Sequence, residues 1–99
     1  MKKLSVVILT SNEEAHITTC LNSVSFADEI IIIDDNSSDA TVSLAKKTGA
    51  QVYGRKLDDF ASQRNYGLSV ATGEWVLFLD ADERVSKDLQ KEIISVVHQ

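Results

Sequence analysis

The residues with the clearest chemistry are two aspartates separated by a single residue, Asp80 and Asp82, directly after the apolar run of residues 75–79. Five consecutive apolar residues are typical of a buried strand, and open α/β sheets bind ligands at the carboxyl ends of their strands. Carboxylate oxygens suit hard divalent cations, and a bound cation can hold a phosphate. A solvated loop is the alternative, but two neighbouring carboxylates are costly to bury there without a cation.

A second acidic pair, Asp34 and Asp35, follows the apolar run of residues 30–33. These carboxylates can accept hydrogen bonds from a ribose hydroxyl or a base N–H. Alternatively, residues 34–38 only form a turn and cap the next helix. Because the chain carries a net charge of −5, an anionic ligand needs local help from a metal or from helix N-termini. The two acidic strand ends therefore indicate a metal-assisted site for a phosphorylated ligand.

The elements that would position these residues follow from the hydrophobic pattern. Apolar runs occur at residues 4–9, 30–33, 51–53 and 75–79, and three of them are continuous, which is typical of parallel strands buried on both faces. Helical patterns cover residues 14–24, 39–48, 60–71 and a last segment after Ser86. This alternation predicts an α/β fold, Rossmann-like, with three α/β/α layers and a mostly parallel sheet in the order 3-2-1-4. That order brings the loops at residues 10–13, 34–39 and 80–82 together.

Single residues refine this picture. Ser38, Asp59 and Ser86 are predicted helix N-caps, and Gly49 is predicted just past a helix end. Cys20 is expected to be a small core residue and Trp75 to pack.

Length and composition limit the function classes. We expect residues 1–99 to form one small domain, truncated at its C-terminus. The acidic charge argues against a nucleic-acid partner. The single cysteine cannot form an internal disulfide, which favours a reducing, cytoplasmic location. The first apolar run is too short for a signal sequence or a membrane span.

Four motifs together resemble the family-2 glycosyltransferases of the GT-A fold. They are Thr-Ser-Asn-Glu-Glu from residue 10, Ile-Ile-Ile-Asp-Asp-Asn-Ser-Ser-Asp from residue 31, Gln-Arg-Asn-Tyr-Gly-Leu from residue 63 and Gly-Glu-Trp-Val-Leu-Phe-Leu-Asp-Ala-Asp-Glu from residue 73. The resemblance extends from about residue 6 to residue 83. Residues 58–83 especially resemble the lipopolysaccharide-core β-glucosyltransferases. At two positions the chain departs from many relatives: Leu9 replaces a proline, and Asn36 replaces a glycine, so the turn there must tolerate asparagine.

The resemblance implies roles for individual residues. Thr10, Asp34 and Asp35 would contact the uracil and ribose of a nucleotide-sugar, and Asp80 would lie near the ribose. Asp82, with Asp80, would bind Mg²⁺ or Mn²⁺ on the diphosphate. Arg64 would contact base or phosphate, although the sequence alone equally allows it to face solvent. The full expected nucleotide-sugar set is Thr10, Glu13, Asp34, Asp35, Arg64 and Asp80.

The resemblance also implies a parent reaction, the inverting transfer of a sugar, with UDP as the expected carrier, to an acceptor hydroxyl in polysaccharide or lipopolysaccharide synthesis. The general base is expected in a following half, so no catalytic residue is assigned here and the chain alone is expected to be inactive. Expected partners are the nucleotide-sugar donor and a saccharide or lipid-linked saccharide acceptor. The parent would be cytoplasmic and peripherally associated with the inner face of the membrane. The chain itself is expected to form a homodimer or larger assembly through the edge of the fourth strand, which would be central in the parent fold, or through the last helix.

Two alternatives stay open. A non-catalytic nucleotide-sugar or metal-binding module would use the same residues. A phosphohydrolase with an Asp-x-Asp nucleophile is disfavoured, because such enzymes normally carry the acidic pair after the first strand.

Overall fold

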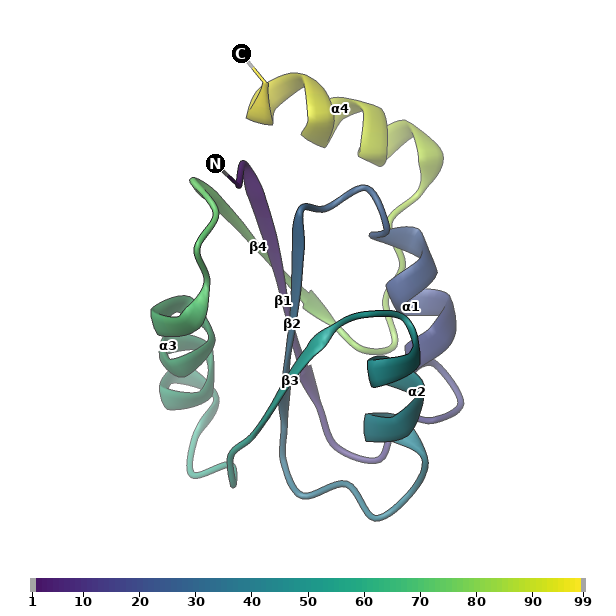
Figure 1. The fold of residues 1–99 in the computed structure, drawn as a ribbon, viewed down its shortest axis with the longest axis vertical. Helices are drawn as coiled ribbons and strands as arrows, with labels where there is room; N and C mark the ends of the chain where they lie inside the picture. The colour runs from purple at the N-terminus through teal and green to yellow at the C-terminus, as the bar shows by residue number, and fades with distance from the viewer. Residues whose placement is uncertain (1, 99) are drawn as a thin grey trace.

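Four parallel strands form the central sheet of the computed structural model, which describes residues 2–98 (Figure 1). In chain order the strands are β1 (Leu4–Thr10), β2 (Glu29–Asp34), β3 (Gln51–Gly54) and β4 (Trp75–Asp80). They lie side by side in the order β3-β2-β1-β4, so β1 and β2 are central and β3 and β4 are edges. The predicted strand order and the α/β fold class are confirmed.

The helices are α1 (Ile17–Ser23), α2 (Thr41–Lys47), α3 (Phe60–Val70) and α4 (Lys87–Val97). Helix α3 covers one face of the sheet and α1 and α2 cover the other, which gives the three layers (Figure 1). Helix α4 lies past the amino ends of the strands, beside the N-terminal end of the chain (Figure 1). No helix among residues 2–98 is long and apolar enough to cross a bilayer.

The predicted caps of the two longest helices are confirmed. Asp59 Oδ1 accepts a hydrogen bond of 2.7 Å from Ser62 N at the start of α3, and Ser86 Oγ accepts one of 3.1 Å from Leu89 N at the start of α4. Each bond satisfies a backbone N–H that has no partner inside the helix. The start of α3 is therefore fixed by a side chain of the preceding loop.

The predicted starts of the first two helices are wrong by two or three residues. Helix α1 begins at residue 17, because the N–H groups of His16 and Ile17 both donate to Glu13 O in a preceding turn. Helix α2 has Ala40, not Ser38, at its N-cap, and Asp39 accepts from Thr41 N instead. Gly49, with φ of 88°, follows the C-cap of α2 as predicted.

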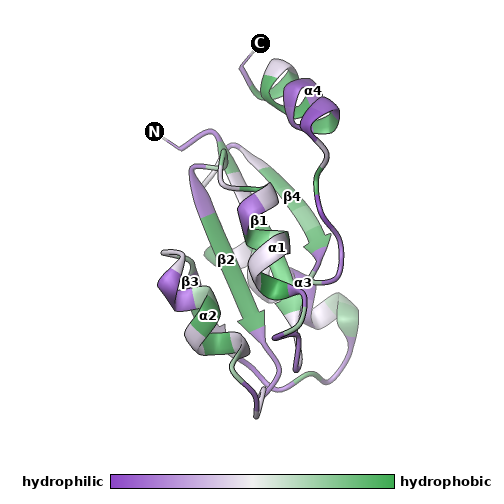
Figure 2. Cartoon of the chain, turned by 90° about the vertical axis from the view of Figure 1, so that its right-hand side faces the viewer, coloured by the Kyte–Doolittle hydropathy of each residue, from purple (hydrophilic) through white to green (hydrophobic). Residues whose placement is uncertain are grey.

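The hydrophobic core occupies both faces of the sheet, and β1 and β2 are its most buried strands. Figure 2 shows that β4 is largely hydrophobic as well. Val6, Ile8 and Ile32 pack under α1 and α2, where Cys20 is a buried core residue as predicted. A smaller cluster lies under α3. Trp75 is 47% exposed, so its predicted packing is wrong, because β4 is an edge strand with β1 as its one neighbour.

A buried carboxylate joins the amino ends of the strands. Glu29, 5% exposed, accepts hydrogen bonds from Ser5 Oγ at 2.7 Å, Thr72 N at 2.8 Å and Lys2 Nζ at 3.0 Å. Burial by itself raises the pKa of Glu29, but these hydrogen bonds outweigh it and lower the pKa to about 2. Glu29 therefore stays ionised and ties β1 and β2 to the segment that leads into β4.

Candidate functional site

A cleft of about 380 Å³ opens at the carboxyl ends of β1, β2 and β4. Its walls come from the loops after these three strands and from the first turns of α3. Six of the seven predicted site residues line it: Thr10, Glu13, Asp35, Arg64, Asp80 and Asp82. Their convergence follows from the strand register, in which Thr10 pairs with Asp34 on one side of β1 and Leu9 pairs with Asp80 on the other.

Asp34 is the predicted site residue that does not line the cleft. It is 4% exposed, and its carboxylate accepts hydrogen bonds from Thr10 Oγ1 at 2.6 Å and from Ser37 N and Oγ at 2.9 and 2.6 Å. A buried carboxylate with three donors holds the surrounding backbone in place. Asp34 therefore stabilises the turn of residues 34–38, as the alternative interpretation of this segment predicts. Its contact with a ligand stays a prediction.

Asp35 faces the cleft from the next position. Its Oδ1 accepts a hydrogen bond of 3.0 Å from Leu57 N, which ties the loop after β2 to the loop before α3. The following residue, Asn36, has φ of 48°, so the turn takes the left-handed conformation that asparagine tolerates. This confirms the expectation for the turn. Asp35 is half-buried and adds a fixed negative charge to the cleft.

The loop after β1 is held by the loop that leads into α2. Asn12 Oδ1 accepts a hydrogen bond of 2.8 Å from Ser38 N, and Glu13 N donates one of 2.8 Å to Thr41 Oγ1. Asn12 itself has φ of 53°, a conformation that asparagine adopts more readily than most residues. The polar residues of this loop therefore present Thr10 and Glu13 to the cleft.

Helix α3 supplies cleft residues that the sequence analysis did not assign, Phe60 and Gln63. Gln63 is 1% exposed, and it donates to Arg55 O and accepts from Arg55 Nη1, both at 2.7 Å. Phe60, Gln63 and Arg64 are spaced i, i+3, i+4, so they share one face of the helix. This spacing, directly after the predicted cap at Asp59, is the sequence signal that could have identified Phe60 and Gln63 as cleft residues.

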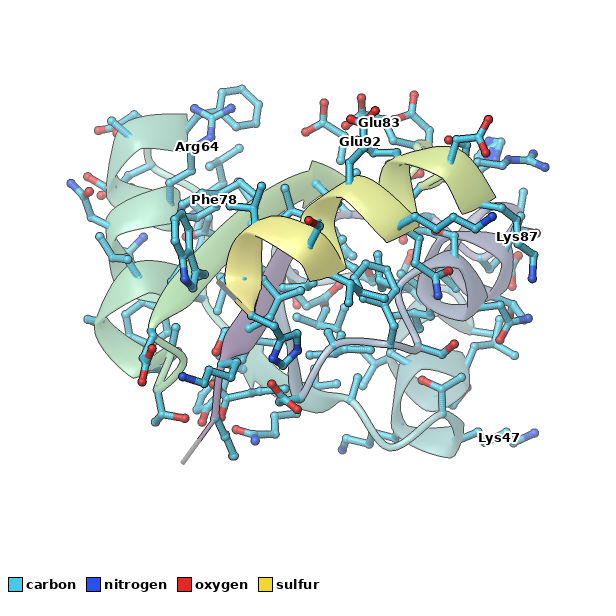
Figure 3. All side chains as sticks on the ribbon, turned by 90° about the horizontal axis from the view of Figure 1, so that it is seen from above. Lys47, Arg64, Phe78, Glu83, Lys87 and Glu92 are labelled. Carbon is cyan, nitrogen blue, oxygen red and sulfur yellow. The ribbon has the colours of Figure 1, made fainter. Side chains whose placement is uncertain are left out.

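Charge in the cleft is unevenly distributed. Among the described residues that line it, Arg64 is the one basic residue, and the acidic ones are Glu13, Asp35, Asp80 and Asp82. In Figure 3, Arg64 on α3 and Glu83 after β4 project toward the same side of the molecule, whereas Lys47 projects from the opposite side.

The acidic residues of the loop after β4 also affect the pKa of the buried Cys20 thiol. Burial, reinforced by the carboxylates of Glu83, Asp82 and Asp80, raises the pKa of Cys20 to about 11.

The loop after β4 presents two exposed carboxylates, those of Asp80 and Asp82. Glu83 closes the turn, because its Oε1 accepts from Asp80 N and its own N donates to Asp80 O, both at 2.9 Å. Within residues 2–98 no group of three or more metal-ligating side chains occurs. Two carboxylates are fewer ligands than a hard divalent cation takes, so phosphate and water would have to complete the coordination of Mg²⁺ or Mn²⁺ at Asp80 and Asp82.

Solved structures share this fold. Staphylococcus aureus TarS, residues 1–349, in complex with UDP-GlcNAc, matches with a TM-score of 0.78 and 31% identity, over 99% of this chain and 31% of that one. Mycobacterium tuberculosis glucosyl-3-phosphoglycerate synthase, in complex with Mn²⁺, UDP and glucosyl-3-phosphoglycerate, matches with a TM-score of 0.68 and 28% identity, over 81% of this chain and 33% of that one.

Sequence relatives agree with the structural ones. The chain is 44% identical over 94 residues to an uncharacterized glycosyltransferase of Rickettsia typhi, a match that covers 94% of the chain and 32% of the relative. The chain thus spans about a third of the length of the curated relatives that it matches first. The profile of the family described as "Glycosyl transferase family 2" matches residues 5–99. Because this match includes nearly every residue, the chain belongs to glycosyl transferase family 2.

Proposed function

We propose that this domain binds the nucleotide-sugar donor of a glycosyltransferase, with UDP as the nucleotide. The observation that carries the proposal is the convergence of six predicted site residues on one cleft of about 380 Å³. Relatives support the choice of ligand, since TarS is described in complex with UDP-GlcNAc and glucosyl-3-phosphoglycerate synthase with UDP.

The proposed division of roles follows the cleft from β2 to β4. Asp35 uses one carboxylate oxygen on Leu57 N, which leaves the other for a base N–H, and Thr10 lies beside it for the base or ribose. Asp34 acts on the ligand through Thr10, to which it is hydrogen-bonded. Glu13 and Asp80 are placed to accept hydrogen bonds from ribose hydroxyls, and Arg64 to donate to phosphate.

A metal ion is part of the proposal because of the charge balance. A diphosphate would meet four carboxylates and one guanidinium in this cleft, which is unfavourable without a further cation. Asp82 and Asp80 would hold Mg²⁺ or Mn²⁺, and the bound cation would neutralise charge on the diphosphate leaving group. The synthase of M. tuberculosis, described with Mn²⁺ and UDP, supports this choice.

For the parent protein we propose inverting transfer of the sugar to an acceptor hydroxyl. The acceptor oxygen would attack the anomeric carbon, the bond to the diphosphate would break, and the hydroxyl proton would pass to a general base. We assign that base to no residue of this chain, so the chain alone binds donor without transferring it. We further propose a saccharide or lipid-linked saccharide acceptor and a peripheral association of the parent with the cytoplasmic membrane face, because residues 58–83 resemble the lipopolysaccharide-core β-glucosyltransferases.

We also propose self-association through the edge of β4 and the apolar side of α4. An apolar groove of about 280 Å³ lies between these elements, and Trp75, Leu89 and Val96 are 47%, 45% and 43% exposed beside it. An edge strand with unpaired backbone groups can pair with the same strand of a second copy across a twofold axis.

The donor-binding proposal is tested by titrating UDP with Mg²⁺, which is diamagnetic, into the ¹⁵N-labelled chain and following backbone amide shifts. We expect the largest shifts at cleft residues such as Thr10, Asp35 and Ala81, with none at the remote pocket that Ser25 and Gly49 line. Shifts confined to the remote pocket, or no saturable shift at all, would contradict donor binding. Sugar transfer by the chain alone would contradict the assignment of the base.

A further inference from the structure

Phe60 is the most exposed of the large hydrophobic side chains among residues 2–98, at 60%, and it lies in the cleft. Others of this kind, such as Trp75 and Leu89, lie along β4 and α4 at the apolar groove. Phe60 is also the one aromatic residue among the described residues that line the cleft. Its ring offers an apolar surface inside an otherwise polar and acidic site, an arrangement that a ligand with a flat uncharged part can use.

The ring of Phe60 is held in place by the helix that carries it. Phe60 is the first residue of α3, directly after the cap in which Asp59 accepts from Ser62 N at 2.7 Å. One turn later, the buried Gln63 is bound to Arg55 through two hydrogen bonds of 2.7 Å. A residue on an anchored first turn loses little backbone freedom on binding, which favours affinity.

Arg64 orients the side chain of Phe60. Its Cζ lies 5.9 Å from the centre of the Phe60 ring, within the range of a cation–π contact, and its position four residues later places both side chains on one face of α3. The guanidinium and the ring therefore form a combined surface, in which a positive group lies next to an apolar plane. A nucleotide has the matching pair of features, a flat base and a negatively charged phosphate.

We propose that Phe60 is the stacking surface for the nucleobase of the donor, with Arg64 holding the ring and reaching toward the phosphates. The inference rests on the proposed donor-binding function and adds the residue that binds the base face. Residues 10–13, at the end of β1 and in the loop after it, include no aromatic residue that could stack in place of Phe60. Stacking on an aromatic side chain depends little on which base is present, so Phe60 contributes affinity, and the hydrogen bonds of Asp35 contribute selectivity.

The experiment compares Phe60→Leu and Phe60→Trp with the unsubstituted 99-residue chain, here called the parent chain, in Mn²⁺. UDP and inorganic pyrophosphate serve as separate ligands. Phe60→Leu keeps an apolar side chain but removes the flat ring, so UDP affinity is expected to fall about tenfold or more, the usual loss for one stacked base. Pyrophosphate affinity is expected to stay unchanged, because that ligand has no base. Phe60→Trp keeps a flat ring and is expected to bind UDP at least as tightly, with quenching of the new indole.

Phe78→Leu is the matched control, since Phe78 is a partly exposed phenylalanine on β4 that does not line the cleft (Figure 3). It is expected to bind UDP as the parent chain does. If Phe60→Leu and the parent chain bind UDP equally, the stacking role is overturned while donor binding stands. If the parent chain binds neither UDP nor pyrophosphate, the donor-binding proposal and the stacking role fail together. An equal loss for UDP and pyrophosphate in Phe60→Leu would also overturn stacking, because it would indicate a general distortion of the cleft.

Discussion

Thr10 and Asp34 occupy paired positions on β1 and β2, and Thr10 Oγ1 donates a hydrogen bond of 2.6 Å to Asp34 Oδ1. Both residues are 4% exposed, yet Thr10 also reaches the cleft wall. The bond therefore joins the core of the sheet to the candidate site. The position of Thr10 in the cleft wall therefore depends on the buried carboxylate of Asp34.

Asp34→Asn is expected to lower the free energy of unfolding by about 1–3 kcal/mol, because the amide is a weaker acceptor for the three donors around this carboxylate. Chemical denaturation at neutral pH measures the loss. Asp82→Asn is the matched control in metal-free buffer, since Asp82 is exposed and has no side-chain hydrogen bond within residues 2–98. Equal stability of Asp34→Asn and the parent chain would contradict the structural role of Asp34.

The same bond predicts coupling between the two residues. Thr10→Val removes the donor, so the double variant Thr10→Val, Asp34→Asn is expected to lose less stability than the sum of the two single variants. Strict additivity of the three free energies would show that the Thr10–Asp34 contact contributes nothing.

Gly67→Ala is expected to destabilise the chain by about 1–3 kcal/mol through overpacking, although alanine usually stabilises a helix relative to glycine. A Cβ at Gly67 would lie 2.5 Å from Val7 Cγ1, in the buried cluster under α3. Gly54→Ala is the control, because a Cβ there has no neighbour within 4 Å. Thermal melts of both variants decide the point, and a Gly67→Ala variant with a raised Tm would show that α3 does not pack this closely.

Glu29 predicts a specific loss of stability in acid. Because its pKa is about 2 in the folded chain, below the ordinary value of 4.5, its contribution is complete above pH 4.5 and is lost as the pH falls through about 2. Glu29→Gln is therefore expected to cost about 1–3 kcal/mol at pH 7. This difference from the parent chain should shrink progressively between pH 4.5 and 2 in denaturation experiments. Glu92→Gln, which changes an exposed carboxylate of α4, controls for the removal of a surface charge. A Glu29→Gln difference that grows as the pH falls would contradict the direction of this pKa shift.

Self-association is expected in sedimentation experiments at about 100 μM chain. Trp75→Lys places a charge on the edge of β4 and should shift the chain to monomer, because charged edge strands resist pairing. Leu68→Lys is the control, since Leu68 is 51% exposed on α3 and does not line the groove between β4 and α4. A monomeric parent chain whose β4 amides are nevertheless protected from hydrogen exchange would overturn this prediction.

Topology explains how much of the site the sequence could predict. The continuous apolar runs define a parallel sheet, and the carboxyl ends of its strands must meet, so Thr10, Asp35, Asp80 and Asp82 could be placed together before any coordinates existed. The helix starts at residues 14 and 39 were wrong because local turns at Glu13 and Asp39 use the first backbone N–H groups.

Side-chain burial was harder to predict than topology. Asp34 and Asp35 are adjacent acidic residues of the same type, but alternation along the strand turns the first toward Thr10 and the second toward the cleft. Phe60 and Gln63 were not predicted as cleft residues, because the candidates were chosen by charge and these two side chains are uncharged. Trp75 was expected to pack because an apolar run does not reveal that its strand is an edge.

The most direct test of the account is the calorimetric titration of UDP into the chain in Mn²⁺ and again in excess chelator. We predict that UDP binds at least about tenfold more tightly in Mn²⁺, because the cation offsets the carboxylates beside the diphosphate. Asp82→Ala should lose this difference, and Asp88→Ala, which removes a carboxylate on α4 outside the cleft, should keep it. Equal UDP affinity in Mn²⁺ and in chelator, with no effect of Asp82→Ala, would contradict the metal-assisted donor site.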